Sequence, residues 1–371
     1  MVVVGAGIVG CSCAYELALR GASVCLVDRG PVSGGTTGLG EGNVLCCDKR
    51  PGVELSLAVP GLALFSEIEE LLGEEAGIRR KGALVVHSDP ASWALEGARL
   101  VELRAAGVRC SLLSADQVRD LEPALSGPML GGSWFPDDLQ CAPLAIARGL
   151  AKRAAALGAV IETGREVRHV AGNMVRFRDE PPIQAGTVVL ACGAWSAPLA
   201  ASAGLHLPVE PRKGQLVRLE HRPDFLRHKV IDGGYMAAVE SEDAGLQVST
   251  VMETTLDGHV LVGSSRERRG VDLSVDPSVT DTLIAQAARL APELARLERS
   301  ATWAGLRPWL PGGLPAIGRT SKAGGLFIAT GHEGAGVAHG PITGRLIAQA
   351  ITGEEPALDL SPFDPDRFSP G

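Results

Sequence analysis

The first thirty residues constrain the fold of this chain more than any other stretch. Val2-Val3-Val4 is a short apolar run that can form a buried strand, and a glycine-rich turn from Gly5 to Gly10 follows at once. Apolar residues then recur at helical spacing up to Gly21, and a second β-branched run from Ala22 to Val27 ends in Asp28. Strand, glycine turn, helix, strand and acid in this order predict a dinucleotide-binding βαβ unit.

Each glycine of the turn has a mechanical role in binding a dinucleotide. Gly5 permits the tight turn, Gly7 lets the backbone approach the pyrophosphate, and Gly10 lets the helix pack closely on the strand. Ile8 and Val9 open the helix, whose free N–H groups and partial positive charge suit phosphate. The alternative is a glycine-rich turn that binds no ligand.

The end of the second strand carries the expected ribose-binding acid. Asp28 lies 23 residues after Gly5, where a carboxylate accepts hydrogen bonds from ribose hydroxyls. Arg29 beside it has two interpretations, since it either favours a 2′-phosphate or is simply solvated.

Composition limits the classes of function. A chain of 371 residues is long for a single core, so we expect two domains or lobes. The net charge of −8, without a basic block, argues against binding to nucleic acid or an anionic membrane surface. No apolar run reaches the roughly 18 residues of a membrane span, and the start has no basic region typical of a signal peptide, so we expect a cytoplasmic enzyme. The eight cysteines have no metal-ligand spacing, and we expect no metal site.

A loop rich in glycine and hydroxyl groups follows the second strand. The segment 33–43, SGGTTGLGEGN, does not suit a regular element. A nicotinamide enzyme does not need such a loop here, whereas FAD is longer and extends past this point. Thr36 and Thr37, after Gly35, can donate to phosphate, and Gly40 to Asn43 can pass under a flat ring. A flexible surface loop is the alternative.

The rest of the chain alternates helical and strand patterns. We expect helices over residues 55–72, 91–106, 143–158, 281–297 and 338–351, the last with Pro341 in its first turn. Ser114 and Gln117 have the spacing of a capping box at the start of a further helix. Residues 216–263 alternate strands and turns without a helical pattern, which indicates an antiparallel sheet, and residues 302–318 read as a loop rich in proline and glycine.

A second glycine loop near the end of the chain completes the predicted cofactor site. Residues 325–330 read as a buried strand, residues 331–337 as a glycine loop and the following stretch as a helix. A doubly wound sheet brings this loop beside the first one, and two such loops suit an extended FAD. We therefore predict an α/β protein with a Rossmann-like FAD-binding domain, mostly parallel, and an α+β substrate lobe with an antiparallel sheet. The predicted FAD-binding domain comprises 1–75, 140–210 and 300–371, and the substrate-binding domain 76–139 and 211–299.

Four blocks of sequence together resemble a known family. They are VVVGAGIVG (2–10), SGGTTGLGEGN (33–43), TVVLACGAWS (187–196) with PRKGQLV (211–217), and WAGLRPWLPGGLPAIG (303–318) with ATGHEGAGVAHGPITG (329–344). In these blocks the chain resembles the FAD-dependent amino-acid oxidoreductases related to D-amino acid oxidase, glycine oxidase and sarcosine oxidase. The GHEGAG form and HVLVGSSRERRGVD (259–272) look closest to the branch of opine oxidase β subunits, D-hydroxyproline dehydrogenase β subunits and a hydrogen cyanide synthase subunit.

The resemblance implies roles for particular residues. Arg307 matches the arginine that pairs with the substrate carboxylate, and Val167 matches the position whose backbone meets the adenine. The remaining positions that match residues around pyrophosphate and flavin are Thr36, Thr37, Glu41, Gly42, Asn43, Gly193, Trp195, His332, Glu333, Gly334, Ala335, Gly336 and Val337. Gly312 and Gly313 depart from the family, which usually has an acid there. No cysteine is placed for covalent attachment, so we expect FAD to bind non-covalently.

The chemistry then suggests a function. Flavin accepts a hydride from the α-carbon of an amine, and Arg307 suits a carboxylate because its planar fork gives two parallel hydrogen bonds. Tyr235 and His332 are further candidate catalytic residues, although no base is needed if the amine enters neutral, and both also read as structural side chains. We expect oxidation of the C–N bond of a D-amino acid, hydroxyproline or opine-type secondary amine.

Several alternatives remain open from the sequence. They are a glycine or sarcosine oxidase that uses oxygen, an NAD(P)-dependent dehydrogenase, and a non-catalytic subunit that only binds FAD. The branch also implies a hetero-oligomer with a second α subunit and an iron–sulfur subunit, in addition to the small amino-acid substrate.

Overall fold

The computed structural model describes residues 1–369, and its first large sheet follows the predicted doubly wound pattern. The sheet has six strands in the order β18-β19-β12-β1-β2-β8. The five strands from β19 to β8 run parallel, and only β18 pairs antiparallel. The strands are β1 (Val2–Val4), β2 (Cys25–Asp28), β8 (Val160–Thr163), β12 (Val188–Leu190), β18 (Ala316–Arg319) and β19 (Leu326–Thr330).

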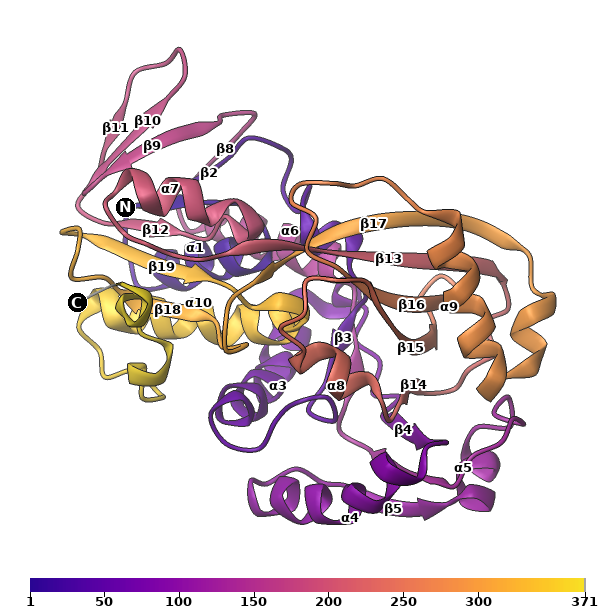
Figure 1. Ribbon diagram of the computed structural model, residues 1–371. Helices are drawn as coiled ribbons and strands as arrows, with labels where there is room; N and C mark the ends of the chain where they lie inside the picture. The colour runs from indigo at the N-terminus through magenta and orange to yellow at the C-terminus, as the bar shows by residue number, and fades with distance from the viewer. Residues whose placement is uncertain (370–371) are drawn as a thin grey trace.

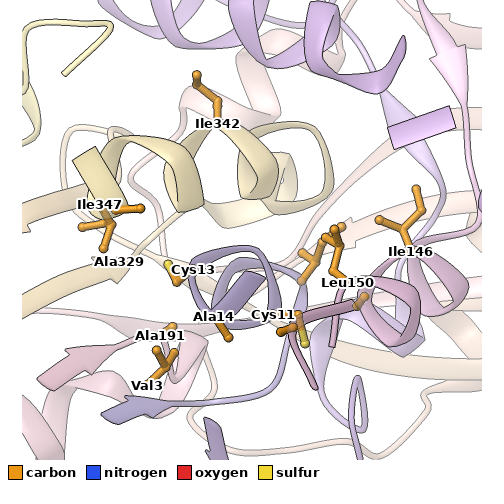
Figure 2. Close-up of a cluster of buried hydrophobic side chains, with 14 of the residues drawn as sticks. Val3, Cys11, Cys13, Ala14, Ile146, Leu150, Ala191, Ala329, Ile342 and Ile347 are labelled. Carbon is orange, nitrogen blue, oxygen red and sulfur yellow. The ribbon is translucent and has the colours of Figure 1, made fainter. Parts of the chain in front are cut away.

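Helices from both ends of the chain pack together on this sheet. Figure 1 shows the indigo α1 (Ile8–Leu19) and the yellow α10 (Gly336–Thr352) beside the same strands, and Figure 2 shows apolar side chains of α1 beside those of α6 (Pro143–Ala156), with α10 on another side of α1. The helices α1 and α10 approach closely because Gly344 has no side chain, since a Cβ there would lie 2.5 Å from the backbone of Ser12. This packing joins the first and last segments of the chain.

The second large sheet is mainly antiparallel, and Figure 1 shows most of it as the orange and dark red strands. Its order is β17-β13-β16-β15-β14-β4-β6-β5, and only β14 and β4 are parallel neighbours. The strands are β4 (Ala83–His87), β5 (Ser111–Ser114), β6 (Gly131–Phe135), β13 (Glu210–His221), β14 (Lys229–Asp232), β15 (Gln247–Thr254), β16 (His259–Arg266) and β17 (Arg299–Trp309). The predicted combination of a mostly parallel and an antiparallel sheet is confirmed.

Helices and short strands complete the fold. The remaining helices are α2 (Thr36–Leu39), α3 (Val53–Leu72), α4 (Pro90–Ala105), α5 (Ala115–Leu121), α7 (Ser196–Ser202), α8 (Tyr235–Glu240) and α9 (Pro277–Leu290). One small sheet contains β9 (Val167–Ala171), β10 (Met174–Phe177) and β11 (Ile183–Gln184), and another pairs β3 (Asn43–Val44) with β7 (Leu139–Gln140). The capping box predicted at Ser114 and Gln117 is confirmed at the start of α5. Within residues 1–369, no helix has the length and apolar character needed to cross a membrane.

Four predictions about local structure were wrong. Residues 302–318 are not a loop, because most of them belong to β17 and β18. Residues 216–263 contain the short helix α8, and the 33–43 loop contains the single turn α2. Pro341 lies in the second turn of α10, because that helix begins at Gly336. The division into two domains remains a proposal. Strand pairing with β13 places residues 299–309 in the second sheet. Residues 370–371, at the end of the predicted FAD-binding domain, lie outside the described part of the chain.

Candidate active site

A cavity of about 610 Å³ is lined by residues from both large sheets. It runs past the carboxyl ends of β1 and β2, where doubly wound sheets bind ligands. Of the residues that the sequence predicted for the site, the following line it: Gly5, Gly7, Ile8, Val9, Asp28, Arg29, Gly35, Thr36, Thr37, Glu41, Asn43, Val167, Gly193, Trp195, Tyr235, Arg307, His332, Glu333, Gly334, Gly336 and Val337.

Three predicted residues do not line this cavity. A Cβ on Gly10 would lie 1.8 Å from the carbonyl oxygen of Gly5, so Gly10 allows the helix to pack on the turn. A Cβ on Gly42 would lie 1.9 Å from the carbonyl oxygen of Cys141, so Gly42 allows two backbones to meet. Ala335 lies instead on a neighbouring cavity of about 220 Å³, whose wall includes Glu333.

The glycine turn forms one end of the large cavity. Gly5 has a φ of +106°, which favours glycine, and a Cβ there would lie 2.4 Å from the carbonyl oxygen of Ala191. The helix α1 begins at Ile8, whose N–H donates to the hydroxyl of Thr37 at 3.1 Å. The first glycine motif and the 33–43 segment are therefore in direct contact.

Asp28 is held rigidly at the end of β2. Its Oδ2 accepts a hydrogen bond from the N–H of Ala6 at 2.6 Å, and its Oδ1 accepts one from the N–H of Gly30 at 2.7 Å. Each carboxylate oxygen has a second lone pair, so this anchored group can still accept ribose hydroxyls. The guanidinium of Arg29 lies 4.4 Å from the centre of the Trp195 ring and 3.9 Å from the carboxylate of Glu166.

The middle of the cavity joins three chain segments. Thr330 at the end of β19 donates through its hydroxyl to the carbonyl oxygen of Gly193 at 3.1 Å, which ties two strand ends together. Thr36 donates to the carbonyl oxygen of Leu306 in β17 at 2.5 Å. The 33–43 segment thus connects the glycine turn with the second sheet.

Glu41 belongs to a buried ionic cluster beside the cavity. Its carboxylate accepts a hydrogen bond from the Lys229 ammonium at 2.6 Å, and Glu253 lies 3.6 Å from the same nitrogen. Burial opposes the charged form of Lys229, but the two carboxylates prevail and raise its pKa. Lys81 also pairs with Glu253, at 2.9 Å, so two lysines balance two glutamates.

Arg307 projects from β17 into the other end of the cavity. Its Nη1 donates to the carbonyl oxygen of Ser265 at 3.0 Å. The guanidinium lies over Gly214 of β13, where a Cβ would come within 2.2 Å of Nη1 and 2.6 Å of Cζ. The bare backbone of Gly214 therefore provides the space in which the guanidinium rests.

Three arginines surround the carboxylate of Glu333. Its Oε1 lies 3.6 Å from Arg212 Nη1, 3.8 Å from Arg266 Nε and 3.9 Å from Arg307 Nε. Burial favours the neutral acid, but the three guanidiniums prevail and lower the pKa of Glu333. The backbone of Glu333 has a φ of +47°, which is uncommon for a residue other than glycine. Tyr235 begins α8 rather than lying in the sheet, and its ring centre is 4.4 Å from the Arg266 guanidinium.

His332 is a buried neutral side chain at the wall of the cavity. Its Nε2 lies 2.9 Å from the hydroxyl of Thr343, and burial lowers its pKa to about 4. His339, one helical turn into α10, is also buried, and its two ring nitrogens have no hydrogen-bond partner in the described part of the chain. At neutral pH His332 carries no positive charge and can only share a proton through a hydrogen bond.

Comparison with known proteins then decides the family. The model of the DAO family, described as FAD dependent oxidoreductase, matches residues 1–350. The chain belongs to this family. It is 31% identical to the glycine oxidase of Pseudomonas aeruginosa over 382 residues, which cover 98% of each protein. It is 28% identical to the hydrogen cyanide synthase subunit HcnC of the same species over 419 residues, which cover 100% of this chain and 96% of that subunit. The crystal structure of glycine oxidase from Geobacillus kaustophilus superimposes with a TM-score of 0.88 at 26% identity, covering 98% of this chain and 97% of that chain.

The protein is therefore an FAD-dependent oxidoreductase, and the NAD(P) alternative is not supported. The large cavity suits FAD because a glycine turn, a helix start and an anchored acid lie at one end and the 332–337 loop lies at the other. Cys192 lines this cavity, but its thiol donates to the carbonyl oxygen of Val4 and burial raises its pKa to about 12. Such a thiol is a poor nucleophile, and non-covalent binding of FAD stays a prediction.

The sequence did not identify three residues that shape the substrate end. Gly214 lies within the PRKGQLV block, but nothing in one sequence shows that a guanidinium rests on it. Arg212 and Arg266 approach Glu333 from different strands. The basic run RERR at 266–269 was a visible signal for Arg266, although such a run is usually a solvated surface.

Proposed function

We propose that this enzyme oxidises the C–N bond of a small amino acid and passes a hydride to flavin. FAD supplies the hydride acceptor, and the chain binds and orients the substrate. The observation that carries the proposal is Arg307, whose guanidinium lines the cavity and is fixed by Ser265 and Gly214. A planar guanidinium in this setting suits a carboxylate held by two parallel hydrogen bonds, which orients the α-carbon.

The loop that leads into α10 suits negative charge on the reduced cofactor. The loop from Glu333 leads into α10, which begins at Gly336. Backbone N–H groups and the positive end of the helix dipole at this point favour an anion. Tyr235 and His332 contribute as wall residues, with Tyr235 as the candidate for a hydrogen bond to substrate.

The substrate falls within a narrow set of amines. The resemblance to the opine and D-hydroxyproline branch favours a D-amino acid, hydroxyproline or opine-type secondary amine. A glycine or sarcosine oxidase that uses oxygen is the second candidate, because a relative 31% identical is a glycine oxidase. The relative named as a hydrogen cyanide synthase subunit favours a complex with further subunits, for which we propose a second α subunit and an iron–sulfur subunit.

Arg307→Ala tests the proposal. We expect KM for the amino acid to rise sharply, equivalent to about 2–5 kcal/mol, because truncation removes one partner of a charge pair. Bound FAD, measured by its visible absorbance, is expected to remain. Arg319→Ala serves as the control, because Arg319 is exposed on β18. A yellow variant with unaltered KM would remove Arg307 from the substrate site.

The substrate itself is found by following bleaching of the flavin. D- and L-amino acids, sarcosine, hydroxyprolines and opines are added with and without air. Bleaching without air identifies the substrate, and rapid recovery of colour in air identifies an oxidase. Failure of all of these amines to bleach the flavin would favour a subunit that binds FAD without turnover.

A further inference from the structure

The charges around Glu333 do not balance. Arg212, Arg266 and Arg307 all lie within 3.9 Å of one carboxylate oxygen, and Glu333 is the acid that they share. Arg268 nearby has its own partner in Glu210, at 3.2 Å. Asp48 also favours the charged form of Arg266 but is itself paired with Lys49, so the contacts within 4 Å leave two positive charges of the cluster unmatched. The ionic cluster at Lys229, by contrast, pairs two lysines with two glutamates.

Unused hydrogen-bond donors accompany the unmatched charges. Arg212 and Arg266 are each only 1% exposed. Among residues 1–369, the Nε of Arg212 and both Nε and Nη2 of Arg266 have no hydrogen-bond partner, and neither does Oε1 of Glu333. Buried charges are normally paired and hydrogen-bonded, because leaving them unpaired is costly. A site with this excess is suited to an anionic ligand.

The excess lies beside the proposed substrate site, because Arg212 and Arg266 line neither cavity and stand behind residues that do. Arg307 lines the large cavity itself, and Tyr235 and Glu333 line it in front of Arg266. Burial and the neighbouring arginines outweigh Glu333 and lower the pKa of Arg212 to about 10, which reflects the crowding of positive charge. Arg266 thus acts on the cavity through Tyr235 and Glu333 and through its electric field.

We propose that the substrate is an amine that carries two acid groups. The proposal rests on the proposed function, in which Arg307 pairs with the first carboxylate. One carboxylate leaves one positive charge unmatched, and a second carboxylate beside Tyr235 and Glu333 neutralises the cluster. Glycine and sarcosine, which have a single acid group, leave the excess in place.

Two ethers that cannot undergo C–N oxidation test this preference on the native holoenzyme. Diglycolate has two carboxylates, and ethoxyacetate has the same ether chain with a methyl group in place of one of them. Binding is followed by the change in flavin absorbance at low ionic strength, where charge effects are least screened. We expect diglycolate to bind at least about tenfold more tightly, as for one additional charge interaction in a partly buried site. Equal dissociation constants, or tighter binding of ethoxyacetate, would overturn the proposal.

Glu333→Gln adds a test in which the charge of the protein changes and the ligands stay the same. Removing the carboxylate increases the positive excess, so the preference for diglycolate over ethoxyacetate should grow several-fold. Glu355→Gln is the control, because Glu355 is exposed beyond the C-terminal end of α10, whose first residues line the cavity, and its loss should leave the ratio unchanged. A preference that shrinks in Glu333→Gln would contradict the proposal. If the variant does not fold, the comparison on the native protein still decides.

The two amines that correspond to these ethers separate the diacid proposal from the proposed amine oxidation on which it rests. Iminodiacetate and N-ethylglycine are compared by their rates of flavin bleaching without air. Faster bleaching by iminodiacetate, together with tighter binding of diglycolate, supports both proposals. Bleaching that is equal or faster with N-ethylglycine, with no preference for diglycolate, overturns the diacid proposal and leaves amine oxidation standing. Tight binding of diglycolate without bleaching of the flavin by any amine supports a diacid site and overturns the proposed oxidation of amines.

Discussion

Replacing Gly214 by alanine tests how the substrate end is built. Gly214 lies on β13 directly opposite Gly305 of β17, and Arg307 is two residues further along β17. Alternate residues of a strand share a face, so the Arg307 side chain crosses the sheet surface above Gly214. The Cβ of an alanine would lie 2.2 Å from Nη1, 2.6 Å from Cζ and 2.7 Å from Nη2. The guanidinium must therefore move.

The size of the movement sets the expected loss. Ordinary contact begins near 3.4 Å, so Nη1 at 2.2 Å has to shift by about 1.2 Å. A misplacement of about 1 Å in a positioning group can cost roughly 100-fold in rate, or about 2.7 kcal/mol. We expect kcat/KM to fall by about 30- to 100-fold, mainly through KM, because the carboxylate clamp is displaced while the cofactor end is untouched.

The assay combines steady-state kinetics with two structural controls. FAD content and thermal stability of Gly214→Ala should match those of the native protein, because alanine is tolerated in a strand at least as well as glycine. Gly186→Ala is the matched control, since a Cβ there meets no atom within 4 Å. A folded Gly214→Ala protein with native kcat/KM would refute the reasoning that this glycine holds Arg307 in place.

Two further predictions concern the cofactor acid and the buried histidine. Asp28→Asn should weaken FAD binding by about tenfold or more, because it removes an acceptor from a carboxylate that already anchors Ala6 and Gly30. Titration of the apoprotein with FAD measures this, and unchanged affinity would remove Asp28 from the ribose site. In the folded protein the pKa of His332 is about 4, below its ordinary value of 6.5. The stability that the neutral ring contributes is therefore complete above pH 6.5 and is lost as the pH falls to 4. The total loss in the free energy of unfolding is about 3 kcal/mol. Chemical denaturation at pH 8 and pH 5 should therefore show a shallower pH dependence for His332→Gln than for the native protein, and an equal slope would contradict the buried neutral state.

The cavity end formed by the glycine turn could be predicted because its information is local. Gly5, Gly7 and Asp28 belong to one continuous βαβ unit, and the turn, the helix start and the acid each depend on near neighbours. The glycine- and hydroxyl-rich 33–43 segment directly after β2 was likewise enough to associate Thr36 and Thr37 with the predicted cofactor site, and both line the cavity. The hydrogen bond between the Ile8 N–H and the Thr37 hydroxyl was not predicted.

Strand β17 could not be predicted, because its sequence has the composition of a loop. Gly305 and Pro308 weaken a strand pattern, yet the segment pairs along its length with β13. It tolerates proline because β17 is the edge strand of the eight-stranded sheet, where one side of the strand has no partner to lose. The long partner strand, rather than local propensity, fixes Arg307 in an extended segment.

Helix α8 shows how a distant residue can decide local structure. The sequence YMAAVE contains good helix formers, but six residues without a side-chain cap are too few to form a stable helix unaided. Its carbonyl end is instead satisfied by Arg212 of β13, which donates to the carbonyl oxygens of Ala238, Val239 and Ser241. A guanidinium at a helix C-terminus both satisfies free carbonyl groups and complements the dipole.

Arg212 therefore has two roles that a single substitution cannot separate. It donates hydrogen bonds to the last carbonyl groups of the helix that begins with Tyr235, and it is one of the three cations around Glu333. Truncating it would remove a positive charge and also release α8, so weaker ligand binding by an Arg212 variant would not identify the charge as the cause. Comparing diglycolate with ethoxyacetate replaces one carboxylate of the ligand by a methyl group while every contact within the protein is kept. The ratio of the two affinities in the native enzyme is consequently the direct measure of the unmatched charge.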